Sequence, residues 1–323
     1  MSGVLLLFPG QGSQAAGMAE YLWQYPVARD TFAEAAEVLG WDIGGLCRTG
    51  SMEELTRTDR TQLAILTCSV AVWRVLQEAG AEFAVAAGHS LGEYSALVAA
   101  GYLSFADALR VVEARGRAML ACAEKRGGTM AAVIGLEDTV VEEVCTALTD
   151  VWPANYNCPG QVVISGAAEA VEEASQLALE RGAKRVLPLP VSGAFHTPFM
   201  AGAAEDLARA LDQVTFHEPD RAVAPEGHET SVDKGGRFFS TTEVRFPDVS
   251  ELKEVLARQL TSPVRFTQSM QALLAAPGAP KWAVEVGPGN VLAGLVKRIA
   301  RDLPVQTTGD TGSLEEVLKR WTA

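Results

Sequence analysis

Apolar residues along this chain fall into two kinds of run. Short uninterrupted runs, such as Val4–Phe8, Phe83–Ala87 and Trp282–Val286, are typical of strands buried on both faces of a sheet. Longer segments carry apolar side chains at helical spacing instead: residues 18–38, 61–79, 93–100, 107–119, 199–211, 249–260, 291–301 and 315–321. Buried strands that alternate with amphipathic helices predict an α/β fold around a parallel sheet.

The pattern changes between Gly128 and Val191. Here the periods of strand and helix follow one another as strand, helix, strand, strand, helix, strand: 129–134, 138–148, 151–157, 161–165, 168–181 and 183–191. This order is that of a ferredoxin-like unit. We therefore expect residues 128–196 to form a small domain, inserted into a larger core made of residues 1–127 and 197–323 and forming one wall of a cleft.

Composition limits the classes to which the protein can belong. The 323 residues suffice for one large domain with a small insert, and no apolar run approaches the ~18 residues of a membrane span. The start of the chain lacks the basic segment of a signal peptide. The net charge of −13 argues against nucleic acid as the main partner. Five cysteines without paired spacing and four dispersed histidines favour a cytoplasmic protein with reduced thiols and no metal site.

Residues 88–92 read Gly-His-Ser-Leu-Gly and join the apolar run 83–87 to the helical segment 93–100. A Gly-x-Ser-x-Gly sequence between a strand and a helix is typical of a nucleophile elbow. The two glycines allow a strained turn that exposes one hydroxyl near a helix N-terminus, where backbone N–H groups stabilise a developing oxyanion. Ser90 is therefore the candidate nucleophile.

A serine nucleophile needs a base, and histidine suits that role near neutral pH. His196 follows the point where the insert rejoins the core, at the mouth of the predicted cleft, and is the candidate base. His89 adjoins Ser90, but neighbours on a sharp turn point in different directions, so we expect a supporting role. His217 and His228 fall in a polar segment, residues 217–237, which reads as a long surface loop.

No carboxylate completes a triad convincingly. Between the candidate nucleophile and base, Asp107 begins a helix, and Asp138 and Asp150 fall inside the insert. A Ser–His dyad, oriented by a carbonyl oxygen, is sufficient for a thioester because a thiolate leaves readily. Arg115 lies on the second helix after the elbow, where its guanidinium would suit a carboxylate on the acyl group; Arg117 is the alternative.

Five motifs, in order, carry a resemblance to a known family. They are Phe-Pro-Gly-Gln-Gly-Ser-Gln at 8–14, Gly-His-Ser-Leu-Gly-Glu-Tyr-Ser-Ala at 88–96, Arg-Gly at 115–116, Gly-Ala-Phe-His at 193–196 and Glu-Val-Gly-Pro-Gly at 285–289. Between Leu5 and about Arg301 the chain resembles malonyl-CoA:acyl carrier protein transacylases, the standalone acyltransferases of fatty acid and polyketide synthesis. The resemblance implies an α/β-hydrolase-like core with a ferredoxin-like insert.

The resemblance also implies an active site. It assigns Ser90 as the acylated residue, His196 as its base, the N–H groups of Gln11 and Leu91 as the oxyanion hole, and Arg115 as the malonyl-binding cation. It further implies that a carbonyl of Gln259 orients the histidine, that Gln62 and His89 line the substrate pocket, and that Phe195 excludes an α-methyl branch. The substrates implied are malonyl-CoA and the phosphopantetheine thiol of an acyl carrier protein, with no tightly bound cofactor or metal.

Several alternatives stay open. The segment 217–242 departs from fatty-acid members and resembles polyketide acyltransferases, so the carrier is either a fatty-acid or a polyketide protein. A malonyl-transfer subunit of a decarboxylase complex would share every motif, a serine thioesterase would share the elbow, and a non-catalytic scaffold would not need Ser90. Basic residues that suit an acidic carrier are Lys125, Arg126, Arg181, Lys184, Arg185, Lys297 and Arg298.

Overall fold

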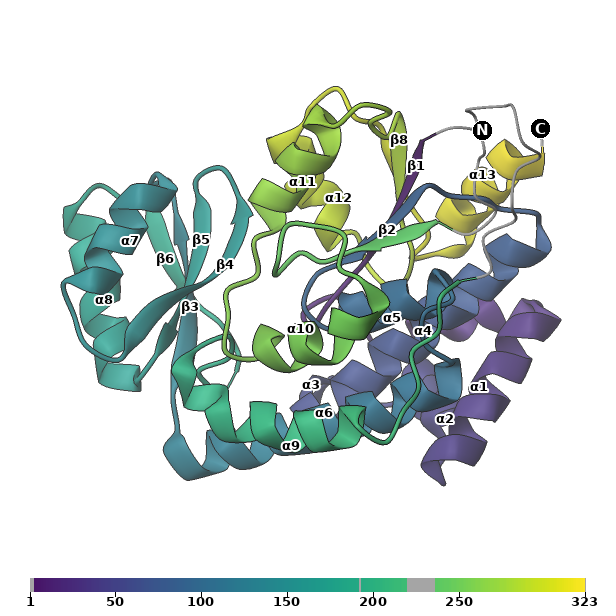
Figure 1. Ribbon diagram of the computed structural model, residues 1–323, viewed down its shortest axis with the longest axis horizontal. Coiled ribbons are helices and arrows are strands. Elements are labelled where there is room, and N and C mark those ends of the chain that lie inside the picture. Colours follow the sequence, from purple (N-terminus) through teal and green to yellow (C-terminus); the bar gives the residue numbers. More distant parts are fainter. Residues whose placement is uncertain (1–2, 192, 220–235, 323) are drawn as a thin grey trace.

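The computed structural model describes residues 3–191, 193–219 and 236–322. Its centre is a parallel sheet with strand order β7-β2-β1-β8-β9 (Figure 1). The strands are β1 (Val4–Phe8), β2 (Val85–Gly88), β7 (Arg237–Phe239), β8 (Trp282–Glu285) and β9 (Val305–Thr307). In the register of the sheet Phe8 lies beside Gly88, so the loops after β1 and β2 leave the sheet at the same edge.

Both faces of this sheet are covered, which explains the uninterrupted apolar strands. On β1, Leu6 and Phe8 join one apolar cluster, and Leu5 and Leu7 join another on the opposite face. The other strands of the sheet and the helices that cover its two faces supply most of the rest of both clusters. The α-helices are α1 (Pro26–Leu39), α2 (Ile43–Thr49), α3 (Met52–Thr56), α4 (Thr58–Glu78), α5 (Gly92–Ala99), α6 (Phe105–Arg126), α7 (Asp138–Thr146), α8 (Ala168–Glu180), α9 (Ala201–Leu211), α10 (Leu252–Gln259), α11 (Phe266–Ala275), α12 (Val291–Ile299) and α13 (Thr311–Thr322).

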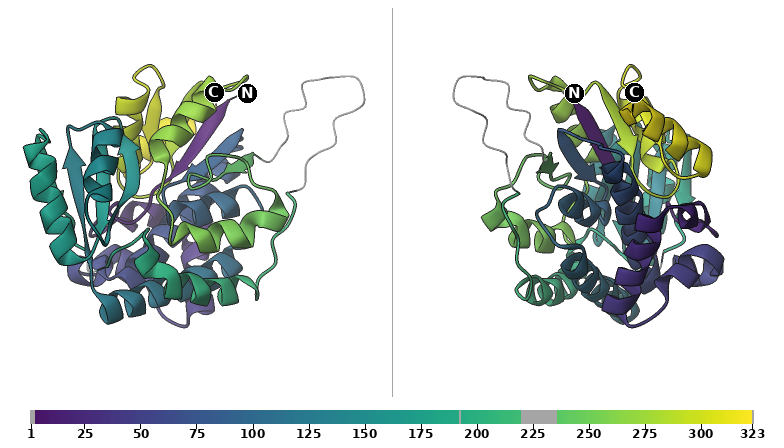
Figure 2. Two further views of the ribbon diagram at one scale, coloured as in Figure 1. Left: turned by 60° about the vertical axis from the view of Figure 1, so that its left-hand side comes forward. Right: turned by 90° about the vertical axis from the view of Figure 1, so that its right-hand side faces the viewer.

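A separate antiparallel sheet forms the second lobe, on the left of Figure 1 and again apart from the main body in Figure 2. Its order is β4-β5-β3-β6, built from β3 (Thr129–Ile134), β4 (Val151–Cys158), β5 (Gln161–Gly166) and β6 (Arg185–Pro188). Ala131 and Val133 face α7 and α8, whereas Met130 and Ala132 face the larger unit. The predicted fold class, a parallel α/β core with a ferredoxin-like unit, is confirmed.

Backbone hydrogen bonds join the two lobes in addition to the covalent connections between them. The Tyr156 N–H donates to the carbonyl of Val264 at 2.8 Å, and the Val264 N–H donates to the carbonyl of Ala154 at 2.9 Å. The Thr267 hydroxyl adds a bond of 3.1 Å to the Tyr156 carbonyl. Strand β4 is therefore fixed to the segment between α10 and α11.

Some element bounds differ from the sequence prediction. The helix expected at 18–38 is interrupted, because Pro26 starts α1 after a short 3-10 helix, η1 (Glu20–Gln24). The closing strand expected at 183–191 is the shorter β6. The predicted loop 217–237 lies mainly in residues 220–235, outside the described residues. Across the described ranges, no helix is long and apolar enough to cross a membrane.

Candidate active site

The turn between β2 and α5 is so tight that two positions admit only glycine. A Cβ at Gly88 would lie 2.0 Å from the carbonyl carbon of Gly92, and a Cβ at Gly92 would lie 2.0 Å from the carbonyl oxygen of Phe8. Between them Ser90 adopts φ 51°, a left-handed backbone that non-glycine residues rarely adopt. This is the geometry of a nucleophile elbow, with Ser90 at its apex.

Ser90 Oγ lies 2.9 Å from Nε2 of His196. The other ring nitrogen of His196 faces two backbone carbonyl oxygens, those of Gln259 at 2.9 Å and Ser262 at 3.1 Å. Both oxygens are acceptors, so Nδ1 carries the proton and donates it. Nε2 is then the unprotonated nitrogen and accepts the Ser90 hydroxyl.

The environment of His196 keeps its imidazole neutral. Burial, together with the nearby positive charge of Arg115, lowers the pKa of His196 to about 3. A neutral imidazole at pH 7 is free to accept a proton. His196 therefore presents its proton-accepting form to Ser90, and backbone carbonyls rather than a carboxylate lie on its far side.

The guanidinium of Arg115 comes from α6 and is almost completely buried. Its Nη2 donates to Ser90 Oγ at 2.9 Å and to Gln259 Oε1 at 3.0 Å. Its Nη1 donates to Gln62 Oε1 at 2.6 Å. The alternative, Arg117, is exposed and forms a surface ion pair with a glutamate one turn away, so it does not face the site.

Ser90, His196 and Arg115 line a pocket of about 90 Å³ between the lobes, whereas Gln62, expected to line it, contacts the Arg115 guanidinium behind the wall. Its walls are Gln11, His89, Ser90, Leu91, Arg115, Met119, Met130, Asn155, Leu189, Val191, Phe195 and His196. Within the described part of the chain, the N–H groups of Gln11 and Leu91 donate to no other residue. Both are therefore available to an oxyanion formed at Ser90. The Phe195 ring narrows the same space.

His89 belongs to the wall of the pocket rather than to the proton path. Its Nε2 lies 2.9 Å from Asn157 Oδ1, and its ring lies beside Phe266. Burial lowers the pKa of His89. The contact with Asn157 links the elbow to β4, so His89 holds the two lobes together next to the nucleophile.

The remaining candidates from the sequence lie elsewhere. Asp107 lies in the first turn of α6, where its N–H donates to the hydroxyl of the capping residue Ser104 and its carboxylate pairs with Arg110, away from His196. His217 lies beside a different hollow, and His228 is outside the described residues. No group of three or more His, Cys, Asp or Glu side chains in the described ranges is arranged to hold a metal ion.

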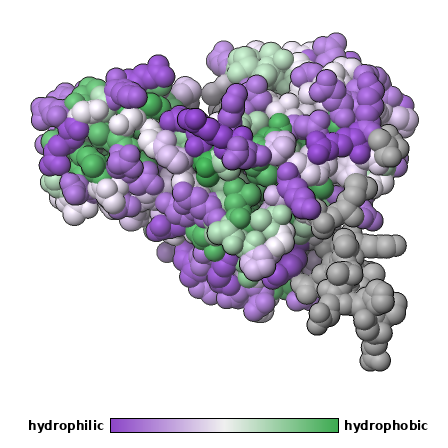
Figure 3. All heavy atoms as spheres, turned by 90° about the horizontal axis from the view of Figure 1, so that it is seen from above, coloured by the Kyte–Doolittle hydropathy of each residue, from purple (hydrophilic) through white to green (hydrophobic). Residues whose placement is uncertain are grey.

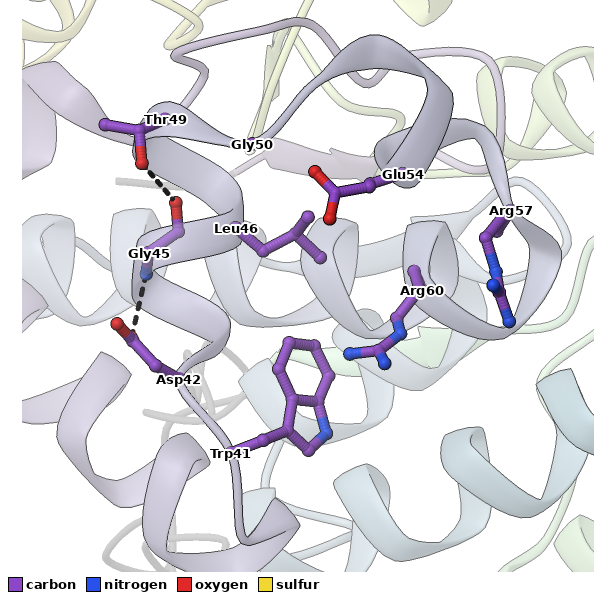
Figure 4. Close-up of a pocket in the computed structure, with 9 residues that line it drawn as sticks. All are labelled: Trp41, Asp42, Gly45, Leu46, Thr49, Gly50, Glu54, Arg57 and Arg60. Atoms are coloured by element: carbon purple, nitrogen blue, oxygen red, sulfur yellow. Dashed lines mark hydrogen bonds between the residues drawn. The ribbon is translucent and has the colours of Figure 1, made fainter.

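A second hollow, of about 420 Å³, lies among α2, α3 and the start of α4 and is drawn in Figure 4. It is lined by Trp41, Asp42, Gly45, Leu46, Thr49, Gly50, Glu54, Arg57 and Arg60. Its charges are already partnered: Arg57 pairs with Asp59 at 3.0 Å, and the Arg60 guanidinium lies over the Trp41 ring. The hollow shares no residue with the pocket at Ser90.

The surface pattern agrees with a cleft between two lobes. Seen from above in Figure 3, apolar residues gather in the middle of the face, between the small lobe and the main body, and polar residues surround them. A pocket of mainly apolar side chains with a few fixed polar groups, such as the pocket at Ser90, is typical of a small-molecule site.

Several residues of the site carry no sequence signal of their own. Met119, Met130 and Asn155 reach the pocket from elements far apart in the chain. Glu93 follows the elbow motif directly, but only the fold reveals that its carboxylate contacts Gln259. Such contacts depend on how the two lobes and α10 meet.

Comparison with known proteins agrees with this geometry. A family model described as "Acyl transferase domain" matches residues 5–318. A malonyl CoA-acyl carrier protein transacylase of Salmonella typhimurium is 43% identical over 98% of this chain and 99% of its own. An acyl carrier protein S-malonyltransferase of Vibrio cholerae has a solved structure with TM-score 0.89, 44% identity and coverage of 98% and 100% of the two chains. A malonyl-transacylase solved in complex with a type II polyketide synthase acyl carrier protein gives TM-score 0.90 and 40% identity, over 99% and 100%.

Proposed function

The chain belongs to the acyl transferase domain family, and from this membership we propose that it moves a malonyl group from coenzyme A to the phosphopantetheine thiol of an acyl carrier protein. The observation that carries the proposal is the convergence on one hydroxyl: Ser90 Oγ lies 2.9 Å from a neutral imidazole and 2.9 Å from a buried guanidinium. The imidazole supplies the base for acyl transfer. The guanidinium supplies a partner for the free carboxylate that distinguishes malonyl from acetyl.

In the first half-reaction, His196 Nε2 takes the proton of Ser90 while Oγ forms a bond to the thioester carbonyl carbon. The N–H groups of Gln11 and Leu91 donate to the oxyanion. Collapse breaks the carbon–sulfur bond, and the departing coenzyme A thiolate takes the proton from the imidazolium. Arg115 holds the malonyl carboxylate on the resulting ester.

The second half-reaction runs the same steps with another thiol. His196 takes the proton of the carrier's phosphopantetheine thiol, and sulfur attacks the ester carbon. Ser90 Oγ leaves and recovers the proton from His196. Throughout, the Gln259 and Ser262 carbonyls keep Nδ1 protonated, so one tautomer serves both halves.

The proposal extends to domain organisation, acyl selectivity and cellular location. We assign residues 128–196 to the small domain and residues 1–127 and 197–323 to the core. Phe195 crowds the position of an α-methyl branch. A cytoplasmic location accords with the five cysteines, all of which are free thiols. The reaction needs no tightly bound cofactor.

The basic residues proposed to meet an acidic carrier differ in their present contacts. Arg181 pairs with Glu143, and Arg298 donates to Gln161 and to the Pro159 carbonyl. The Arg126 guanidinium lies 4.0 Å from the centre of the Phe199 ring, and Lys125, Lys184, Arg185 and Lys297 remain candidates for a docking surface. Choice between a fatty-acid carrier and a polyketide carrier would depend on how well each carrier's acidic surface fits these basic residues.

Intact-mass measurement tests the proposed activity. Incubation with malonyl-CoA is expected to add one malonyl group to the wild-type chain and none to Ser90→Ala, and a holo carrier protein is expected to remove the group and acquire it. Rapid release of free malonate without carrier would instead identify a thioesterase. Transfer that requires a co-purifying subunit would identify part of a decarboxylase complex. Absence of any adduct on the wild-type chain would refute the proposal.

A further inference from the structure

Glu93 is a fully buried carboxylate one turn after the nucleophile, on α5. The Thr241 N–H donates to its Oε1 at 2.6 Å, and the Gln259 side-chain N–H donates to its Oε2 at 2.7 Å. The hydroxyls of Ser240 and Thr241 lie 3.2 Å and 3.0 Å from Oε1. Both carboxylate oxygens therefore face N–H donors, a setting that fits an acceptor-only group.

Gln259 connects this carboxylate to the reacting groups. Its Nε2 donates to Glu93 and also to the Ser90 carbonyl at 3.1 Å. With Nε2 held in this way, Oε1 must face the other direction, where it accepts Arg115 Nη2 at 3.0 Å. An amide rotated by half a turn would present N–H to N–H, so Glu93 fixes which end of Gln259 meets the guanidinium.

The buried positive charge of Arg115 is a second reason to connect Glu93 with this guanidinium. Arg115 is buried, and across the ranges that the structure describes it forms no salt bridge. A buried cation without a counter-ion is costly. Glu93 reaches it through a single amide, and the two groups interact electrostatically. Burial raises the pKa of the Glu93 carboxyl, and the hydrogen bonds from Thr241 and Gln259 oppose that rise.

We propose that Glu93 is a positioning residue for selection of the acyl group: through the Gln259 amide it aims the Arg115 guanidinium at the carboxylate of the bound malonyl. This rests on the malonyl transfer proposed above. The base is held differently, because His196 contacts the main-chain carbonyl of Gln259 and not its side chain. Loss of Glu93 should therefore affect the carboxylate-bearing acyl group far more than the dyad.

The test compares Glu93→Gln with the wild-type chain, using malonyl-CoA and acetyl-CoA as donors and holo carrier protein as acceptor. We expect kcat/KM for malonyl to fall by about 10- to 100-fold, as for loss of a charged hydrogen-bond partner, and kcat/KM for acetyl to fall by less than about threefold. The malonyl-to-acetyl ratio is the readout, since a merely structural defect lowers both rates together.

Glu285→Gln is the matched control. Glu285 is also a buried glutamate that accepts two N–H donors, from Leu292 at 3.0 Å and Ala293 at 2.8 Å, but it caps α12 and lies outside the pocket. This variant is expected to lose stability and keep the ratio. If Glu93→Gln does not fold, Glu93→Asp supplies the same readout, because it keeps the charge and withdraws it from Gln259.

A double-mutant cycle closes the test. In an Arg115→Ala background, Glu93→Gln is expected to leave the malonyl-to-acetyl ratio unchanged, because the two residues act on the same step. An unchanged ratio in Glu93→Gln alone, or an additive effect in the double variant, overturns the proposal. These outcomes differ from failure of the proposed function itself, in which the wild-type chain forms no malonyl adduct.

Discussion

The guanidinium of Arg115 and the hydroxyl of Ser90 lie 2.9 Å apart, although Arg115 comes from the buried face of α6 and Ser90 from the turn after β2. The group that reacts and the group that recognises cargo are thus immediate neighbours. An acyl group on Ser90 necessarily places its far end within reach of the cation. Selection for a carboxylate-bearing acyl group should therefore depend on this guanidinium.

Replacement of Arg115 by alanine should change which acyl group is transferred. Removal of the guanidinium is expected to lower kcat/KM for malonyl-CoA by roughly 100-fold or more, because a charged bidentate partner is lost. Acetyl transfer should change little. Adduct mass and carrier transfer with both donors measure the ratio, and equal losses for the two donors would remove the carboxylate role.

The pH dependence of kcat/KM should show that the His196 imidazole stays neutral in mild acid. With a pKa of about 3 in the folded protein, His196 stays unprotonated at pH 5.5, where a histidine of ordinary pKa (about 6.5) would lose roughly tenfold in base form. We expect kcat/KM at pH 5.5 within about twofold of its value at pH 7.5. In Arg115→Ala the acid limb should move to higher pH, since a nearby positive charge is removed. An acid limb near pH 6.5 in the wild-type chain would contradict this.

The same group should make the folded protein less stable in acid. Between pH 3 and pH 6.5 the unfolded chain binds a proton at His196 that the folded chain does not, so this contribution to the free energy of unfolding decreases as the pH falls through that window. Above pH 6.5 the contribution is constant. Urea unfolding of the wild-type chain and of His196→Ala, at pH 5 and pH 7.5, measures the difference; a loss of stability that is the same in both chains would exclude His196 as its source.

The elbow should tolerate no added methyl group. Gly92→Ala places a Cβ 2.0 Å from the Phe8 carbonyl oxygen, and we expect a loss of about 3–5 kcal/mol in the free energy of unfolding together with loss of the adduct. Gly294→Ala in α12 is the matched control, since a Cβ there meets nothing within 4 Å. That change is expected to stabilise the protein by roughly 0.5–1 kcal/mol. Similar stability of both variants would argue against the tight turn.

Truncation of Phe195 should relax the selection against branched acyl groups. Phe195→Ala opens the wall of the pocket, and the ratio of kcat/KM for methylmalonyl-CoA to that for malonyl-CoA is expected to rise by about tenfold. The buried ring is also part of the core, so a loss of about 3–5 kcal/mol in stability is expected. The ratio is measured on the folded fraction, and an unchanged ratio would place the selection elsewhere.

Local signals in the sequence predicted most of the fold and part of the site. Gly88 and Gly92 define the elbow because the turn itself requires them, and β1 was predicted within its observed bounds because continuous burial leaves an uninterrupted apolar run. Short elements such as α2 and β9 were not predicted, since a few residues carry too little periodicity. Pro26 marks the break that the apolar spacing of 18–38 obscures.

Contacts between segments far apart in the chain could not be predicted from the spacing of residues in the sequence. Glu93 and Gln259 are 166 positions apart, and their hydrogen bond exists only because the fold brings the start of α5 close to the end of α10. The same holds for His89 and Asn157, which belong to different lobes. Resemblance to a family assigned roles to single residues, whereas the connections among those residues come from the three-dimensional arrangement.

The three residues from Ser262 to Val264 contact both the catalytic histidine and the small lobe. The Ser262 carbonyl holds the imidazole, and Val264 exchanges main-chain bonds with the strand that forms the opposite wall. Only Pro263 separates these two anchors, so a displacement of this strand would also disturb the Ser262 carbonyl that orients the imidazole. The wall of the pocket and the orientation of the base are therefore coupled through three consecutive residues.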